Sequence, residues 1–190
     1  INFGKMSFPK LWLEHGGIYE IPDMVISYYP MNLDLLYMLP LVFGNDIFPK
    51  LIHFVFALGT AWLIFTYLAK TTGQTVCAYG RYLFLSTPVI VKLSITAYVD
   101  LGLIFFSTAG LMQLLQWHIN SPRIKHLVMA AVFCGLAMGT KYNGLIVFLL
   151  LTMLVLFLSS SGMSKNRSTP GQILFYGLFF TIIAGLVYSP

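Results

Sequence analysis

The chain has 190 residues, of which 58% are hydrophobic and only 9% are charged. A soluble domain needs about a quarter of its residues charged to cover its surface, so this composition excludes a soluble protein and indicates a polytopic membrane protein. Lys and Arg (11) exceed Asp and Glu (6), giving a net charge of +5, but the basic residues are scattered singly between apolar runs. They form no basic stripe, and we exclude nucleic acid as a partner.

The first 46 residues differ in kind from the rest, because they hold five of the six acidic residues. Phe8, Leu11 and Trp12 fall on one helical face, which suits a short helix lying in the membrane interface. Residues 31–42 predict a second short helix that ends or breaks near Pro40. We therefore expect residues 1–46 to form an extracytoplasmic loop region of short interfacial helices.

A spanning helix needs about 20 predominantly apolar residues. This criterion predicts six spanning helices, at residues 47–68, 75–93, 97–117, 126–140, 144–159 and 173–188. The expected fold is all-α: a polytopic transmembrane helix bundle over residues 47–190, in one membrane domain with residues 1–46. Because the chain begins at Ile1 without a signal peptide and ends at Pro190 as an apolar helix finishes, we expect an internal piece of a longer protein.

The positions of lysine and arginine in short loops predict how the chain is oriented in the membrane, because positive residues are retained on the cytoplasmic side. With residues 1–46 outside, the inner connections hold Lys70, Arg123, Lys125, Lys165 and Arg167, and the outer ones hold Lys50, Lys92 and Lys141. Arg81, about two turns into the second predicted span, adds to this bias if its side chain extends toward the inner surface. We expect both ends of the chain to be extracytoplasmic.

Asp100 is the only acidic residue after Asp46, and it lies near the start of an apolar predicted helix. A carboxylate placed centrally in a bilayer costs about 3 kcal/mol even on insertion scales. Asp100 either caps the helix or pairs with a lysine at the outer interface, or it has a functional role. We favour the functional role, because intramembrane ionisable groups are functional by default.

Lys92 and Lys141 stand at outer helix ends, on the side that the charge rule disfavours. One interpretation is interfacial anchoring, with the stems covering apolar surface and the amines in the head-group layer. Together with Asp100 on the same face, and with Tyr98 and Tyr142 beside them, the lysines predict a site for an anionic ligand.

Four further features have simpler explanations. Glu14 and His15 can bind a divalent metal or handle a proton, but an ordinary polar edge of an interfacial helix is the favoured interpretation. Gly135 and Gly139 form G-x-x-x-G, which predicts close helix packing. His53 is a lone histidine in an apolar helix, where satisfied packing or an interfacial role is favoured over ligation. Cys77 and Cys134 lie in separate apolar runs and offer neither a disulfide framework nor a metal cluster.

The order of four segments is distinctive. They read FPKLWLEHGG at 8–17, YYPMN at 28–32, AYVDL at 97–101 and GLAMGTKY at 135–142. Over nearly the whole chain, this order resembles the multi-spanning glycosyltransferases of the GT-C class, in the group of protein O-mannosyltransferases and aminoarabinose transferases. It is especially similar to their bacterial relatives, the phospholipid-carrier-dependent glycosyltransferases.

The resemblance implies an enzyme that transfers a sugar from a polyprenyl-phosphate-linked donor to an acceptor on the extracytoplasmic face of the bacterial inner membrane. Asp100 matches the family's acidic position, and Lys141 and Tyr142 match its Gly-Thr-Lys-Tyr ending. The family's first acidic motif lies upstream of the counterpart of Phe8, so we expect the usual catalytic base to be absent from this piece.

Sugar transfer from a lipid-linked phosphate suggests roles for the candidate residues, which we state as hypotheses. Lys92 and Lys141 would bind the departing phosphate, and Asp100 would orient acceptor or sugar hydroxyls. The expected partners are the lipid-linked sugar donor and membrane lipids. The acceptor stays open, and so does the cofactor, for which a divalent metal ion is the candidate.

Two rival functions stay open. A transporter or flippase would place Asp100 and Arg81 along a translocation path, but such proteins usually show paired broken helices in two related halves, which the sequence lacks. A non-catalytic membrane subunit built on the transferase scaffold is the other alternative.

Overall fold

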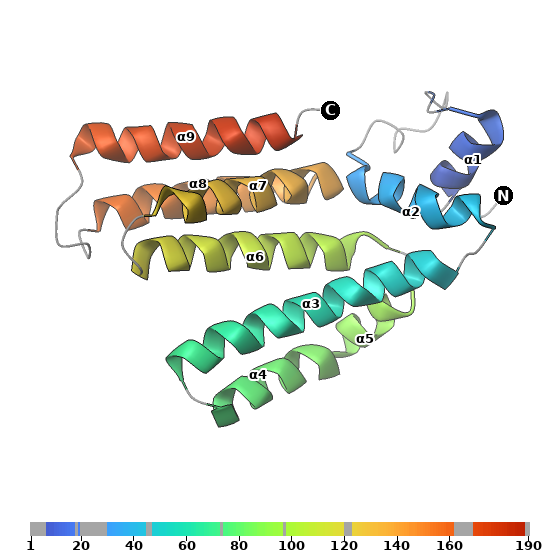
Figure 1. Cartoon of the computed structure of the whole chain (residues 1–190), viewed down its shortest axis with the longest axis horizontal. Helices are drawn as coiled ribbons and strands as arrows, with labels where there is room; N and C mark the ends of the chain where they lie inside the picture. Colours follow the sequence, from blue (N-terminus) through green and yellow to red (C-terminus); the bar gives the residue numbers. More distant parts are fainter. Residues whose placement is uncertain are drawn as a thin grey trace. The chain divides into compact units, whose positions relative to one another are not determined.

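The computed structural model describes residues 7–17, 19, 30–44, 47–72, 74–96, 98–119, 123–161 and 169–188. These residues form nine α-helices, and no strand occurs among them (Figure 1). The chain divides into two compact units, residues 1–105 (unit 1) and residues 106–190 (unit 2). The prediction of an all-α fold is confirmed for the described residues.

Unit 1 begins with two short helices, α1 (Ser7–His15) and α2 (Asn32–Val42), where the sequence predicted them. Pro40 does not end α2, which continues for two residues beyond it. The helix ends at Val42, and Gly44, two residues later, has a φ of 67° and donates its backbone N–H to the carbonyl of Leu41 at 2.9 Å. A positive φ is accessible to glycine without steric cost, so Gly44 suits the end of a helix.

Three helices follow in unit 1: α3 (Ile47–Thr71), α4 (Gln74–Ser86) and α5 (Pro88–Ser94). Helix α4 runs back alongside α3, and α5 turns away from the direction of α4 (Figure 1). The single helix expected at 75–93 is therefore wrong, because the chain breaks at Thr87, whose backbone is extended (φ −61°, ψ 122°). A proline disfavours helical backbone in the residue before it and is well suited to start a new helix, which explains the break before Pro88.

Helix α6 (Asp100–Ile119) begins in unit 1 and continues into unit 2, which also contains α7 (Ile124–Thr140), α8 (Gly144–Ser160) and α9 (Pro170–Tyr188). A short turn at residues 141–143 joins α7 to α8. The core of unit 2 is apolar and includes Leu114, Trp117, Leu127, Cys134, Val155 and Phe180.

The G-x-x-x-G segment of α7 packs closely, as predicted. A Cβ atom added at Gly135 would lie 2.6 Å from the carbonyl oxygen of Ala184 and 2.6 Å from Cβ of Val187, both on α9. Only a residue without a side chain permits this approach of two helix backbones. Gly135 therefore has a packing role.

Two helices are long and apolar enough to cross a membrane, α3 and α9, among the residues described. Helices α7 and α8 are apolar but have 17 residues each. Five of the six segments predicted to span each correspond to one helix, and the segment at 75–93 forms two; the bundle of six spans stays a prediction. Several predictions involve residues outside those described: Tyr28, Tyr29, Ala97, Lys165, Arg167 and the side chain of Phe8.

Candidate functional site

The connection between α5 and α6 in unit 1 carries two of the candidate residues, Tyr98 and Asp100. His53 of α3 contacts this connection, and its side chain is fully buried. Its Nδ1 lies 3.0 Å from the carbonyl oxygen of Leu93 and 2.9 Å from that of Thr96. Its Nε2 lies 3.0 Å from the backbone nitrogen of Leu101.

These contacts assign the tautomer of His53. Carbonyl oxygens only accept hydrogen bonds, so Nδ1 carries a proton and donates it to Leu93 and Thr96. The backbone N–H of Leu101 only donates, so Nε2 carries no proton and accepts. His53 is therefore a neutral, satisfied core histidine, which confirms the interpretation from the sequence. It also supplies an acceptor for one of the N–H groups that every helix leaves unpaired in its first turn.

A second side chain holds the same connection from α2. The hydroxyl of Tyr37, which is 1% exposed, donates a hydrogen bond of 2.7 Å to the carbonyl oxygen of Tyr98. Burial, followed by the negative charges of Asp34 and Asp100, raises the pKa of Tyr37 far above its usual value of 10.0. The phenol therefore stays protonated and remains a donor at any physiological pH.

Two carboxylates in unit 1, Asp34 and Asp100, thus contribute to the raised pKa of the buried Tyr37 phenol. Asp34 lies one helical turn before Tyr37 on α2, and Asp100 is the first residue of α6. Both side chains are partly buried. The N-terminus of a helix carries a partial positive charge, so an acidic side chain such as Asp100 suits the first position of α6. The arrangement can present an oriented carboxylate to a hydroxyl group of a bound molecule.

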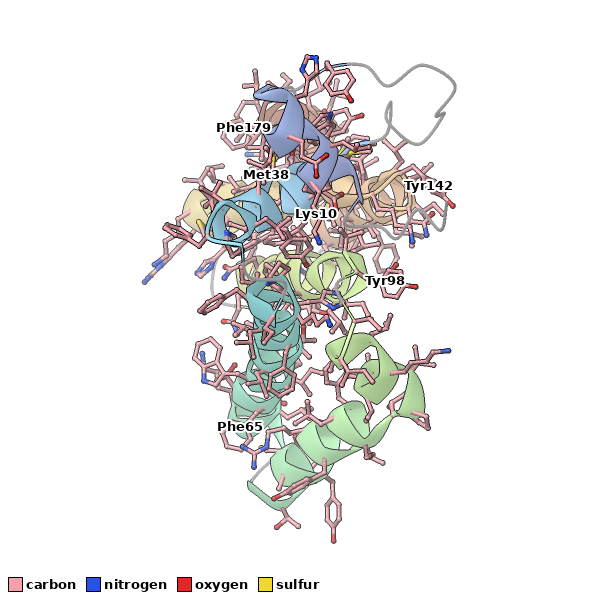
Figure 2. All side chains as sticks on the ribbon, turned by 90° about the vertical axis from the view of Figure 1, so that its right-hand side faces the viewer. Lys10, Met38, Phe65, Tyr98, Tyr142 and Phe179 are labelled. Carbon is pink, nitrogen blue, oxygen red and sulfur yellow. The ribbon has the colours of Figure 1, made fainter. Side chains whose placement is uncertain are left out.

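The other candidates divide between the two units. Tyr98 in unit 1 is partly buried beside the chain that leads into α6 (Figure 2). Lys92 lies exposed in the last turn of α5, where a cation suits the partial negative charge of a helix C-terminus. Lys141 and Tyr142 lie in unit 2, directly after α7; Lys141 has extended backbone (φ −164°, ψ 151°), and Tyr142 is 51% exposed.

Glu14 and His15 lie at the exposed end of α1. Glu14 lines a hollow of about 290 Å³ between α1 and α2, together with Lys10. The ring of His15 stands against Tyr19, with centroids 4.1 Å apart. Within the described residues, no group of three or more His, Cys, Asp or Glu side chains is arranged to hold a metal ion.

Sequence reasoning did not select Asp34, Tyr37 or His53 for this region. The spacing of Asp34 and Tyr37, one turn apart on a predicted helix, was a visible local signal. The contacts to Tyr98 and Leu101 join residues 61 and 48 positions apart, and no local pattern marks them.

A family model described as dolichyl-phosphate-mannose-protein mannosyltransferase matches residues 25–188. The chain belongs to this family. The match includes Lys92, Tyr98, Asp100 and Lys141, and α1 with Glu14 and His15 lies before it. No curated protein and no solved structure matches the chain. This is a family of membrane glycosyltransferases, and its name describes the transfer of mannose. The match supports the resemblance drawn from the sequence.

Proposed function

We propose that the protein transfers a sugar from a polyprenyl-phosphate-linked donor to an acceptor on the extracytoplasmic face of the membrane. The family match over residues 25–188 is the observation that carries this proposal. The name of the family describes a mannosyl donor linked to dolichyl phosphate, and we propose a donor of the same chemical kind here.

The reaction is a substitution at the anomeric carbon of the sugar. An acceptor hydroxyl forms the new bond to this carbon, and the bond from the carbon to the phosphate oxygen breaks. Polyprenyl phosphate leaves with the electron pair, and the hydroxyl proton passes to a base. The groups needed are a carboxylate beside the hydroxyl and a cation beside the departing phosphate.

Unit 1 offers both kinds of group on one stretch of chain. We assign Asp100 to orient an acceptor or sugar hydroxyl, because it is held at a helix N-terminus beside a connection fixed by His53 and Tyr37. Lys92 is exposed in the last turn of α5, and only residues 95–99 separate that turn from α6. We assign it to the donor phosphate, because a lysine amine binds phosphate as a compact point charge.

The roles of four further residues follow from the sequence pattern. Lys141 and Tyr142 are assigned to donor binding from the Gly-Thr-Lys-Tyr ending. Glu14 and His15 are assigned to substrate binding from their place in the interfacial region. A divalent metal ion stays a candidate cofactor.

The test is a transfer assay with the full-length protein in proteoliposomes and a radiolabelled polyprenyl-phosphate mannose. We expect label to leave the lipid fraction and enter a covalent product. Lys92→Ala and Lys141→Ala should each lower kcat/KM about tenfold or more, since each removes a charge-assisted contact to phosphate. Lys50→Ala, which removes another exposed lysine at the start of α3, is the matched control and should keep wild-type activity.

The assay also separates the alternatives. Movement of intact labelled lipid across the bilayer, without a new covalent product, would contradict transfer and indicate a flippase. Absence of both activities over a panel of polyprenyl-phosphate sugars, with a correctly folded protein, would contradict the proposal in favour of a non-catalytic subunit.

A further inference from the structure

Arg81 is a charged residue of unit 1 that the proposed function does not use. It lies on α4, seven residues after the helix begins at Gln74, which is about 10 Å along the axis. Its side chain is partly buried, and its guanidinium carbon lies 5.4 Å from the ring centroid of Phe65 and 5.4 Å from that of Tyr82. Figure 2 shows Phe65 on α3.

The charge of Arg81 is not matched by a carboxylate on either helix that surrounds it. The sequences of α3 and α4 contain no Asp or Glu, and the side chain makes no ion pair within the described residues. Its contacts are with aromatic faces, which attract a cation but leave its hydrogen-bond donors available. In the predicted topology α4 belongs to a membrane-embedded segment, where an arginine without a carboxylate partner is costly and an anion would lower that cost.

Arg81 lines a pocket on the surface of unit 1. The pocket has a volume of about 300 Å³ and lies between α3 and α4, lined by Leu58, Ala61, Trp62, Phe65, Arg81, Tyr82 and Leu85. The α3 positions follow the spacing of one helix face, with Ala61 buried as the floor. Trp62 and Tyr82, each 62% exposed, form an aromatic rim. Tryptophan and tyrosine are typical of the layer where lipid head groups meet the acyl chains.

The pocket therefore combines one cation, aromatic groups at the rim and apolar walls. We propose that this pocket binds an anionic membrane phospholipid, with Arg81 on the headgroup phosphate and the apolar wall of Leu58 and Leu85 against the acyl chains. A planar guanidinium matches the oxygens of a phosphate in pairs, and the apolar walls favour a lipid over a free phosphate ion. Arg81 lies about 10 Å along α4 from the α3–α4 connection, which follows exposed Lys70 in the last turn of α3 and is the cytoplasmic end in the predicted topology.

The test is native mass spectrometry of the full-length protein released from vesicles of phosphatidylglycerol mixed with phosphatidylcholine. The wild type should retain one phosphatidylglycerol that Arg81→Gln loses, with its apparent affinity lowered about tenfold or more. Leu85→Phe, which fills the pocket and leaves the charge, should lower the affinity as well. Lys70→Gln removes a positive charge outside the pocket and is the matched control, which should bind as the wild type does.

Each outcome decides the proposal, and none depends on sugar transfer. Equal losses in Arg81→Gln and Lys70→Gln would indicate diffuse attraction to a basic surface and overturn the pocket. Release of the lipid by excess inorganic phosphate alone, or equal retention of phosphatidylcholine, would overturn recognition of an anionic phospholipid. Unchanged binding in Leu85→Phe would place the lipid elsewhere.

Discussion

His53 is the residue whose removal tests most sharply how unit 1 positions Asp100. In His53→Ala, the buried N–H of Leu101 loses its acceptor and the carbonyl of Thr96 loses the imidazole donor. The carbonyl of Leu93 is less affected, because it also accepts from the hydroxyl of Thr96 at 2.9 Å. An unsatisfied buried group costs about 1–3 kcal/mol, so the two losses together amount to about 2–6 kcal/mol.

This loss should appear locally, in the connection between α5 and α6. Hydrogen exchange measured by mass spectrometry on the full-length protein should report it in peptides that cover residues 93–103. A loss of about 1–3 kcal/mol at the Leu101 amide corresponds to exchange that is roughly 5- to 150-fold faster. His53→Gln offers both a donor and an acceptor in its amide, so part of the protection should return.

Thr60→Ala is the matched control for this prediction. Thr60 is also buried on α3, but its hydroxyl bonds to the carbonyl of Phe56 in the same helix at 2.9 Å. Its removal should leave the exchange of residues 93–103 unchanged. Equal exchange in His53→Ala and wild type, or an equal increase in Thr60→Ala, would refute the positioning role of His53.

Two further predictions concern the packing of each unit. Tyr37→Phe removes the hydrogen bond to the Tyr98 carbonyl and should destabilise the protein by about 1 kcal/mol in thermal unfolding. Because the folded pKa of Tyr37 is raised, its contribution is fully present below about pH 10 and is lost as the pH rises above this value. The alkaline loss of stability should therefore be smaller in Tyr37→Phe, and an identical slope in both proteins would contradict the buried phenol. In unit 2, Gly135→Ala places a Cβ against α9 and should cost about 1–3 kcal/mol, whereas Gly185→Ala, with nothing within 4 Å, should not. Equal melting temperatures for the two alanine variants would contradict the close approach of α7 and α9.

Composition and local pattern were enough to predict the helices. Apolar runs located every long helix, and Pro9 and Pro40 did not prevent two short helices at α1 and α2. The break at Thr87 was not predicted, although its cause is visible in the sequence. A proline disfavours helical backbone in the residue before it, and Pro88 lies inside the span expected at residues 75–93.

The candidate site could be predicted less fully, because the residues that position it are far from it in the sequence. Asp100 stood out by its scarcity, as the one acidic residue in the last three quarters of the chain. His53 and Tyr37 act on the connection before it from two other helices, across 48 and 61 positions. Such contacts depend on how α2, α3 and α6 pack, and periodicity along one helix contains no information on that packing.

The central claim is that Asp100 serves sugar transfer, and its most direct measurement is kcat of Asp100→Asn in the full-length protein. A carboxylate that orients or activates a hydroxyl contributes about a hundredfold or more to the rate. We predict a loss of this size in kcat, with melting temperature and donor affinity close to those of the wild type. Unchanged turnover in a correctly folded Asp100→Asn protein would contradict the claim and remove Asp100 from the site.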